Sequence, residues 1–576
     1  MKKKKKNSGD LNNLITLLAI IVLLNYVGSF VFHRFDLTSE KRYSLSEQTI
    51  TTAENLEDVV YFKIYLESKD FTPELKRLRD ATYEMMEELK AYGGSNIEYE
   101  FIDPNENPDQ KSRDEFHQQL YKKGLRPTDL QTVDEDGQSR KTIWPWAILS
   151  YRGKELPVEL LQSQLGGVAE SMVNSSIENL EYELANGIKT ISSGHVKIIG
   201  FIEGHGELDK YETGDIANEL SKFYRVDRVS IDGRLSQLTE RIIDSASTYV
   251  KNKYDLIIIA KPDSAFTEKD KFIIDQHIMY GGKVLWLIDP VFASMDSLMG
   301  ENITMAIRQE TNLDDQLFKY GARINANLIQ DLQSTKIPVV AGFSGNQPQY
   351  KFFNWYFFPL LNPTQHPISK NLNLTKGEFT STIDTVGSSE IKKTILLTTS
   401  AKTKTVNTPT RISLGILRFD PNPAQFNEPN QSVAVLLEGK FESVFNGRIP
   451  DNIENSKEIK FKPKSDDNKM IVISDGDIIK NFVNRETKQI MPLGYDRYTR
   501  EFYGNKDFIM NCINYLCEDS GMMTARNRSF KIRLLDKVKV KAEKTKWQFI
   551  NTIVPLLLLV AFGFTWNFIR KKKFTK

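Results

Sequence analysis

Two long apolar runs, one near each end of the chain, most strongly limit how this sequence can fold. Residues 14–32 and 549–569 contain no charged residue, and Trp547 and Trp566 lie near the edges of the second run. A helix of about 20 residues spans the ~30 Å hydrocarbon layer of a bilayer. A cleaved signal peptide is the alternative for the first run, but bulky residues follow it where cleavage needs small ones. We therefore expect two transmembrane helices.

Positive charge gathers outside these runs, although the whole chain has a net charge of only +2. Lys2 to Lys6 precede the first run, and Arg570 begins a basic tail after the second. Flanking lysines hold the N-terminus in the cytoplasm, and a second span returns the C-terminus to that side. We expect cytoplasmic tails at residues 1–13 and 570–576, a bacterial inner-membrane location and a large periplasmic body. The balanced total charge gives no indication of nucleic-acid binding.

Residues 526–548, just before the second run, form a basic juxtamembrane stretch that fits two interpretations. It is either a solvated stalk or a segment whose charges meet anionic lipid or an acidic partner. The sequence leaves both open.

The two cysteines, Cys512 and Cys517, provide no disulfide framework for the body. On a helix over residues 506–516, a spacing of five residues is about 7.5 Å, beyond the ~7 Å limit for a bridge. Apolar cores must therefore stabilise the body, which a chain of 576 residues is long enough to build.

Residues 46–165 predict a first α/β module. A strand over 59–66 precedes Thr72-Pro73-Glu74, which is a typical helix start, and a second strand follows over 97–102. A hairpin around residues 152–154 completes a pattern that is typical of a thioredoxin-like fold. The redox chemistry of that fold needs a Cys-x-x-Cys after the first strand, and residues 67–71 contain no thiol. We therefore expect a binding or spacer module.

An acidic connecting helix over residues 170–192 leads into a second α/β domain at residues 193–525. Its strands at 197–202, 254–260, 284–288 and 470–473 are mainly apolar and alternate with helical segments. Strands that are apolar on both faces are typical of a parallel sheet covered by helices on both sides. The sequence therefore predicts a doubly wound α/β domain.

Polar residues follow several of these strands. They are Glu203, His205, Glu207, Asp289, Asp475 and Asp477. Ligands of open parallel sheets bind at the carboxyl ends of the strands, so these six residues are our candidate ligand-binding site. The alternative is that they serve tight turns, where Asp and Gly are common for backbone reasons. They match neither a helix-borne zinc motif nor a phosphate-binding loop.

Residues 352–358 form an aromatic cluster that also has two interpretations. It is either a patch for a partner or a membrane surface, or part of a buried core.

Several stretches between residues 170 and 370 together resemble one known family. They are residues 176–186, the Gly204-His205-Gly206-Glu207 turn, residues 275–286, residues 313–321 and residues 359–370. In this order they resemble the GldG family, the gliding-motility-associated, substrate-binding-like auxiliary membrane proteins of ABC transporters in Bacteroidetes-type bacteria. The two end anchors extend the resemblance to the whole chain.

The resemblance implies a multi-span ABC permease and a cytoplasmic ATPase as partners, with membrane lipid and envelope or motility proteins beside them. It also implies that residues 193–525 are similar to class I glutamine amidotransferases. The sequence departs from that enzyme class, because Asp289-Pro290 stands after the 284–288 strand where a cysteine nucleophile is needed.

We therefore expect a non-catalytic auxiliary subunit without a cofactor or metal. The sequence has no Gly-x-x-x-x-Gly-Lys-Ser/Thr loop, so ATP-driven work belongs to another chain. Two alternatives stay open. One is an extracytoplasmic receptor that binds a solute or glycan in the strand-end crevice, and the other is a metal-dependent hydrolase built on His205, Glu207, Asp289 and Asp475.

Overall fold

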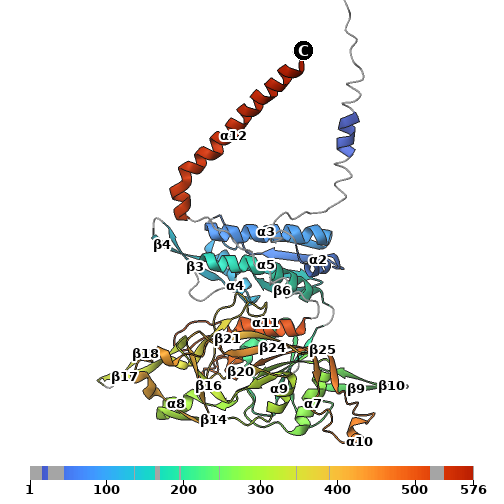
Figure 1. The fold of residues 1–576 in the computed structure, drawn as a ribbon, viewed down its shortest axis with the longest axis vertical. Coiled ribbons are helices and arrows are strands. Elements are labelled where there is room, and N and C mark those ends of the chain that lie inside the picture. Colours follow the sequence, from blue (N-terminus) through green and yellow to red (C-terminus); the bar gives the residue numbers. More distant parts are fainter. Residues whose placement is uncertain are drawn as a thin grey trace, which may run out of the picture. The chain divides into compact units, whose positions relative to one another are not determined.

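The computed structural model describes residues 16–23, 45–69, 71–134, 137–161, 169–193, 196–244, 247–345, 347–387, 389–484, 486–518 and 537–574. By its internal contacts the chain divides into two compact units, Met1–Arg528 and Ser529–Lys576. The described residues form a mixed α/β protein, as the sequence predicts (Figure 1).

The larger unit begins with a four-stranded sheet. Its strands lie in the order β2 (Ile97–Phe101), β1 (Val60–Ile64), β5 (Trp146–Tyr151) and β6 (Lys154–Glu159). β1 and β2 are parallel and joined through helix α3 (Pro73–Gly93), whereas β5 is antiparallel to both β1 and β6. The predicted strand-helix-strand unit and the following hairpin are therefore present. The thioredoxin-like fold itself stays a prediction.

Helix α3 begins where the sequence indicates. The Thr72 hydroxyl accepts a hydrogen bond from the Leu75 backbone N–H, and Pro73 occupies the first turn. The apolar patterns do not predict the other elements of this module, which are α2 (Glu47–Glu54), α4 (Gln110–Lys122), β3 (Thr128–Asp134) and β4 (Gly137–Ile143). In α4, Leu120 is the one buried residue, so the sequence of this helix has no long apolar stripe from which it could be predicted.

The predicted connecting helix is part of the first module's core. Helix α5 (Ala169–Ser192) buries Leu180, Leu184 and Ile188 against the same cluster as the four-stranded sheet. Its Glu181 carboxylate accepts hydrogen bonds from the Ser46 backbone N–H at 2.6 Å and the Thr49 hydroxyl at 2.9 Å. The helix therefore packs into the module instead of bridging open space.

The second domain is built on a ten-stranded sheet. Its parallel part has the order β8 (Arg225–Ser230), β7 (Ile198–Glu203), β11 (Leu256–Ala260), β12 (Lys283–Leu287) and β25 (Lys464–Ile473). Antiparallel strands continue it as β24 (Ser432–Glu442), β21 (Lys392–Thr398), β18 (Gln347–Pro363) and β17 (Ser334–Ser344), with β19 (Thr375–Lys376) paired to β18. The strand order of this parallel part reverses between β7 and β11, and such a reversal is the switch point at which ligands bind in open parallel sheets.

Helices cover both faces of this sheet. Ile258 of β11 packs in one core with α6 (Gly214–Leu220) and α11 (Asn505–Cys517). Its neighbours Ile257 and Ile259 pack in another core with α7 (Glu268–Met279) and α9 (Asp314–Tyr320). This alternation explains why the strand is apolar throughout. Cys512 and Cys517 are both buried in α11 and are not joined in a disulfide bond.

A long insertion between β12 and β25 builds a further core. Its short elements are β13 (Val291–Phe292), α8 (Met295–Glu301), β14 (Ile303–Arg308), β15 (Ala322–Ile324), β16 (Asn327–Asp331), β20 (Ile383–Thr385), β22 (Thr403–Asn407) and β23 (Thr410–Ser413). Trp355, Phe357 and Phe358 are buried in this core, whereas Phe352 is exposed. The buried-core interpretation is therefore correct for these three rings, whereas a partner or membrane patch stays a prediction for the exposed end of the cluster.

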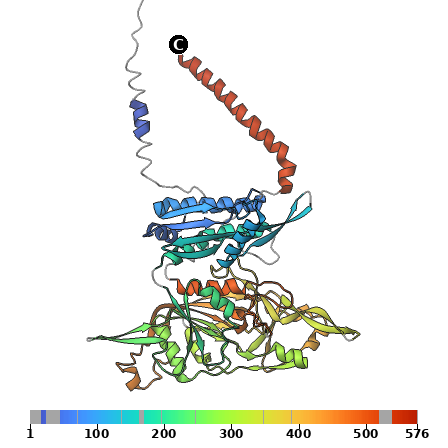
Figure 2. The ribbon, with the colours of Figure 1, turned by 180° about the vertical axis from the view of Figure 1, so that it is seen from behind.

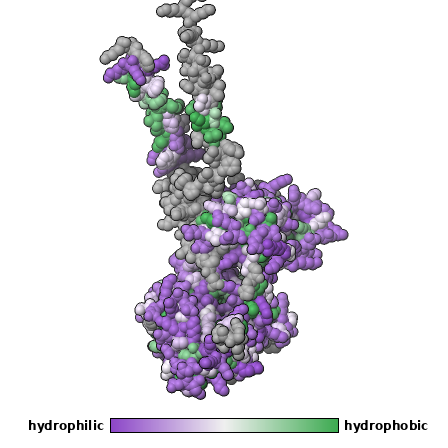
Figure 3. Space-filling view, turned by 90° about the vertical axis from the view of Figure 1, so that its right-hand side faces the viewer, coloured by the Kyte–Doolittle hydropathy of each residue, from purple (hydrophilic) through white to green (hydrophobic). Residues whose placement is uncertain are grey.

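The smaller unit is helix α12 (Lys537–Phe574), which contains Pro555. Within it, Glu543–Lys573 is the one helix among the described residues that is long and apolar enough to cross a membrane. Apolar side chains gather along this helix in Figure 3, whereas the body surface on view is mainly polar. Of the predicted first span, residues 16–23 are helical, and the remainder lies outside the described residues.

Candidate functional site

Three parallel strands end side by side at one edge of the large sheet. β12 lies between β11 and β25 and is parallel to both. Lys261 follows β11, Asp289 follows β12, and Asp475 and Asp477 follow β25. Ligands of open parallel sheets bind at this edge, which is therefore the candidate site.

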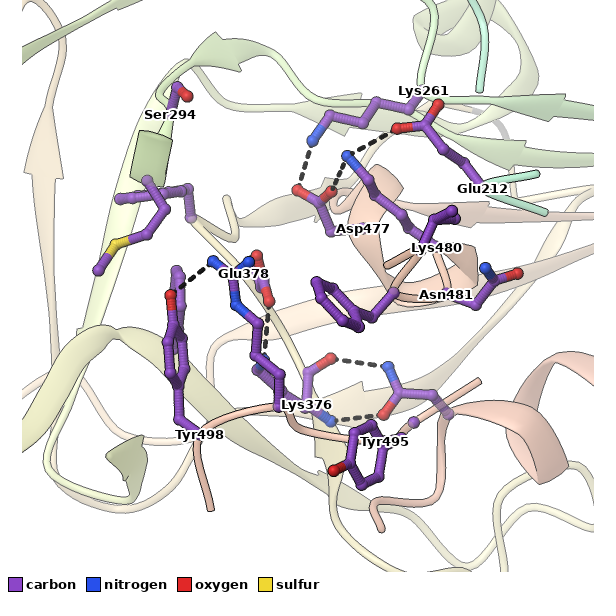
Figure 4. A pocket seen from close by; sticks show the side chains of 18 of the residues that line it. Glu212, Lys261, Ser294, Lys376, Glu378, Asp477, Lys480, Asn481, Tyr495 and Tyr498 are labelled. Atoms are coloured by element: carbon purple, nitrogen blue, oxygen red, sulfur yellow. Dashed lines mark hydrogen bonds and ion pairs between the residues drawn. The ribbon is translucent and has the colours of Figure 1, made fainter. Parts of the chain in front are cut away.

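Lys261 links the ends of the three strands. Its Nζ lies 3.1 Å from Asp289 Oδ2 and also contacts the Asp477 carboxylate (Figure 4). Gly476 allows this approach, because a Cβ at position 476 would lie 2.4 Å from the Cβ of Lys261. A side chain at position 476 would therefore push β11 and β25 apart at their ends.

Asp475 closes the turn after β25. Its carboxylate accepts hydrogen bonds from the backbone N–H of Asp477 at 2.9 Å and of Glu378 at 2.8 Å, and from the Thr380 hydroxyl. Asp289 accepts the backbone N–H of Gly476. These bonds give Asp289 and Asp475 the turn-forming role that the sequence left as the alternative.

Burial and pairing shift the pKa values of this cluster in different directions. Burial raises the pKa of Asp289 and of Asp475. Burial also opposes the charge on Lys261, but Asp289 and Asp477 outweigh it and hold the pKa of the ammonium above its ordinary value. Lys261 in turn lowers the pKa of Asp477 against the effect of burial. The cluster therefore centres on the ion pair between Lys261 and Asp477.

A cavity of about 320 Å³ opens beside this cluster. Its charged and amide residues include Glu212, Lys261, Asp296, Lys376, Glu378, Asp477, Lys480, Asn481, Arg497 and Asn505, and its rings are Phe358, Phe379, Phe482, Tyr495 and Tyr498. This volume is at the lower end of the roughly 300–1,000 Å³ range of small-molecule sites. The mixture of rings and polar groups suits a small ligand that has both apolar and hydrogen-bonding parts.

The other two lysines of the lining are also paired with carboxylates. Lys376 Nζ lies 2.7 Å from Glu378 Oε1 and 2.7 Å from Asp496 Oδ2, and 5.2 Å from the centre of the Phe358 ring. Burial opposes its charge, but Glu378 and Asp496 raise the pKa of Lys376 above its ordinary value. Lys480 Nζ lies 3.1 Å from Glu212 Oε1 and 3.8 Å from Asp477 Oδ1.

Arg497 also lines the cavity, but its environment differs from that of the three lysines, which are paired with carboxylates. Its guanidinium is exposed and lies 5.2 Å from the centre of the Phe482 ring and 4.6 Å from that of Tyr498. Among the described residues no carboxylate lies within ion-pair distance of it. Arg497 is therefore the positive group of the cavity that is most available to a ligand.

The turn after β7 forms a separate, closed cluster. His205 Nδ1 lies 3.3 Å from Glu207 Oε1, His205 Nε2 lies 3.4 Å from Asp270 Oδ2, and the imidazole stacks on Phe266 at 3.6 Å. Although burial opposes protonation, Glu207 and Asp270 raise the pKa of His205. The Asp263 backbone N–H donates to the His205 carbonyl at 2.9 Å, so the turns after β7 and β11 are bound together at the switch point.

The structure thus divides the six predicted residues into three groups. Asp289, Asp475 and Asp477 share one cluster, and of these Asp477 lines the cavity. His205 and Glu207 form the second group, and Glu203 is paired with Arg228 as the third. The cavity is lined by Lys261 after β11, by Asp477 after β25 and by Glu212 from the segment between β7 and α6. Ligand binding by these residues stays a prediction.

The lining cations are the residues that sequence reasoning missed. Lys261 follows the apolar β11 strand directly, so the position that singled out Asp289 also marks it. Lys376 and Arg497 come from a two-residue strand and from a loop, where no apolar pattern marks their position. The ion pair between Lys376 and Asp496 joins these two segments at the site.

The geometry does not assemble the four residues of the hydrolase hypothesis. His205 and Glu207 are paired with each other, whereas Asp289 and Asp475 bond to Lys261 and to backbone N–H groups. In the part of the chain that the structure describes, no group of three or more His, Cys, Asp or Glu side chains is arranged to hold a metal ion.

The fold and the cavity define a mixed α/β domain with a polar strand-end pocket, carried by a chain with an apolar C-terminal helix. Residues 196–512 match the family described as an ABC-type uncharacterized transport system, with an auxiliary role in transport. Because this match covers more than half of the chain, the chain belongs to that family. Residues 39–150 match a domain of unknown function, DUF7088.

One further protein sequence and one solved structure are similar to parts of this chain. An uncharacterized protein of Borreliella burgdorferi is 21% identical over 461 residues, which are 78% of this chain and 81% of that protein. A solved structure titled mmIFT52 N-terminal domain aligns with a TM-score of 0.29 and 12% identity, covering 56% of this chain and 98% of that one. The family match indicates a non-catalytic role associated with ABC transport, and the apolar helix indicates a membrane association.

Proposed function

We propose that this protein is a non-catalytic auxiliary subunit of an ABC transporter complex involved in gliding motility. The observation that carries the proposal is the family match over residues 196–512 in a chain that also has an apolar helix at Glu543–Lys573. Its α/β domain receives or relays conformational change from the membrane complex. The finer resemblance to the GldG family supplies the link with motility and with envelope proteins.

The site's chemistry supports a non-catalytic role. At the strand ends, where an enzyme of this fold class positions reactive groups, Lys261 is held between Asp289 and Asp477. Cys512 lies fully buried in α11, and burial raises the pKa of its thiol well above the ordinary value. Neither arrangement provides an activated nucleophile.

The proposed partners are a multi-span permease and a cytoplasmic ATPase. In the proposed topology, residues 14–32 and α12 both span the inner membrane, both termini are cytoplasmic, and the body with its thioredoxin-like and amidotransferase-like folds is periplasmic. Two helices cannot form a solute pathway alone, so they pack against the permease. Gly563 offers a small residue for close approach, and among the described residues no atom beyond its own turn of helix lies within 4 Å of a Cβ built there.

Purification from the native membrane in mild detergent tests the proposal. We expect a multi-span protein and a nucleotide-binding protein to co-purify, as identified by mass spectrometry. Gly563→Leu should reduce their recovery at least several-fold, because the larger side chain blocks helix contact without touching this chain's own packing. Leu559→Ile on the same helix is the control and should leave recovery unchanged. Recovery of the wild-type chain alone would reject the proposal.

A small-solute or glycan receptor is the second candidate function. The exposed guanidinium of Arg497 beside the Phe482 and Tyr498 rings favours it, because aromatic faces and one available charge are typical of such sites. A panel of sugars, amino acids and peptidoglycan fragments should then raise the melting temperature of the chain. Arg497→Ala should abolish that rise, and Arg500→Ala, an exposed arginine outside the lining, should keep it. A panel without any stabilising compound counts against this candidate.

A further inference from the structure

The β17–β18 hairpin carries an exposed apolar surface that the proposed function leaves unexplained. Its two long strands pair antiparallel, and the arm projects from one side of the α/β domain (Figures 1 and 2). The exposed fractions of its side chains are 44% for Val340, 72% for Phe343, 58% for Tyr350 and 49% for Phe352. Such exposure of large apolar side chains on one arm indicates an interaction surface.

The register of the hairpin brings these side chains to one face. Val340 pairs with Tyr350, and Pro338 pairs with Phe352. Directly paired residues and alternate residues of a strand share a face. Between Val340 and Gly342 the register shifts by one residue, so that Phe343 pairs with Pro348 and joins the same face. Without this bulge, Phe343 would point to the opposite side.

We call this surface the hairpin face. It consists of Pro338, Val340, Phe343, Pro348, Tyr350 and Phe352. The opposite side of the arm is polar towards the tip, where Gln349 and Lys351 lie. At the base, Ile337 is fully buried in the core that contains Trp355, so the arm is fixed to the domain.

The arm carries positive charge only. Residues 334–363 include Lys336 and Lys351 but no Asp or Glu. β17 is the edge strand of the sheet, and its Pro338 and its bulge both disfavour the addition of another strand. The arm therefore offers its side chains, and not its backbone, to an occupant that tolerates positive charge.

We propose that the hairpin face inserts into the surface of an anionic lipid bilayer. Aromatic side chains favour the headgroup region, and Lys336, which alternates with Pro338 and so lies on the side of the hairpin face, can meet anionic lipid there with no acid on the arm to oppose it. A face of six residues is much smaller than the roughly 20 to 30 residues that each side of a stable protein interface contributes. Lipid requires no matching shape, since each inserted side chain adds its own transfer free energy. This contact would be additional to the α12 anchor.

Site-specific fluorescence in the full chain tests this proposal. Cys512 and Cys517 are buried, so a single cysteine introduced by Phe343→Cys can be labelled selectively with an environment-sensitive dye such as NBD. In vesicles of phosphatidylglycerol and phosphatidylcholine we expect a blue shift, at least a twofold rise in emission and quenching by doxyl-labelled lipids. Gln349→Cys, on the opposite side of the arm, is the matched control and should show none of these.

Other occupants give different results. A blue shift that persists in detergent micelles and grows with protein concentration would identify a second copy of this chain as the occupant. A blue shift that needs co-purified membrane proteins would identify a protein partner. Either result, or equal signals from the two labels in lipid, would overturn the proposal. Replacing both lysines with Lys336→Gln and Lys351→Gln should lower the signal in anionic vesicles at least twofold and leave it unchanged in pure phosphatidylcholine.

Discussion

Lys261 Nζ and the Asp477 carboxylate form an ion pair that joins the end of β11 to the end of β25 across the intervening strand β12. Asp289, at the end of β12, contacts the same Nζ at 3.1 Å. One lysine thus pairs with carboxylates from two strands at the edge of the sheet. Removing it would leave two acids with little solvent around them.

We expect Lys261→Met to destabilise the chain by about 3 kcal/mol, because removing one partner of a mostly buried ion pair leaves the other charge buried and unpaired. The side chains of Lys261 and Asp477 are 26% and 10% exposed, so little water compensates. Urea unfolding of the detergent-solubilised chain at pH 7.5 measures the change. The loss should shrink as the pH is lowered and Asp289 takes up a proton.

The control for this prediction is Lys480→Met. The Lys480 side chain is 37% exposed and contacts Asp477 at 3.8 Å, so its loss should cost no more than about 1 kcal/mol. Equal losses in the two variants would show that the strand-end pair has no special role.

Gly476→Ala should destabilise the chain by about 2 kcal/mol through overpacking. The new Cβ would lie 2.4 Å from the Cβ and 3.0 Å from the Cα of Lys261, and the backbone atom cannot move aside freely. Gly300→Ala is the matched control, because no described atom beyond its own turn of helix lies within 4 Å of a Cβ built there, and alanine favours helix α8. Thermal unfolding of both variants compares them, and a Gly476→Ala variant as stable as Gly300→Ala would contradict the packing argument.

The sequence predicts the parallel strands of the second domain well, because their two-sided burial leaves an uninterrupted apolar run. Ile257 and Ile258 of β11 pack into different cores, so every position of the strand must be apolar. The antiparallel strands that extend the same sheet are only partly marked in this way. Residues 433–437 of β24 form a buried apolar run, but Glu438 and Gly439 follow within the same strand, and the partner residues in β21 lie dozens of residues away.

The candidate site is predicted in part for the same reason. Asp289 and Asp477 stand where apolar runs stop, and parallel strands bring such positions to one edge. Lys376 reaches the cavity because β19 pairs with β18, a relation that no local pattern reveals. The closure of the β7 turn by stacking of His205 on Phe266 depends on tertiary packing, which spacing along the sequence does not encode.

His205 should contribute stability that depends on its protonated form. Burial opposes the charge, but Glu207 and Asp270 raise the pKa of His205 above its ordinary value. The contribution is therefore fully present below the unfolded-state pKa of about 6.5 and is lost as the pH rises through the folded-state pKa. We expect His205→Gln to cost more stability at pH 5.5 than at pH 9, as measured by urea unfolding. An equal cost at both pH values would show that its charge is irrelevant.

His277 should show the opposite sign. It is fully buried in α7 with its ring against Gly282, and burial lowers its pKa from 6.5 to about 4. Because the unfolded state binds the proton more tightly, stability is fully present above about pH 6.5 and is lost as the pH falls towards about 4. The shift corresponds to about 3 kcal/mol of unfolding free energy over that window.

His277→Leu tests this prediction, because it keeps a side chain of similar volume and removes the titrating group. The difference in unfolding free energy between wild type and variant should therefore change by about this amount between pH 7.5 and pH 4. The comparison at pH 7.5, where the wild-type imidazole is neutral, isolates any packing cost. A difference that stays constant over the whole range would show that the buried imidazole does not resist protonation.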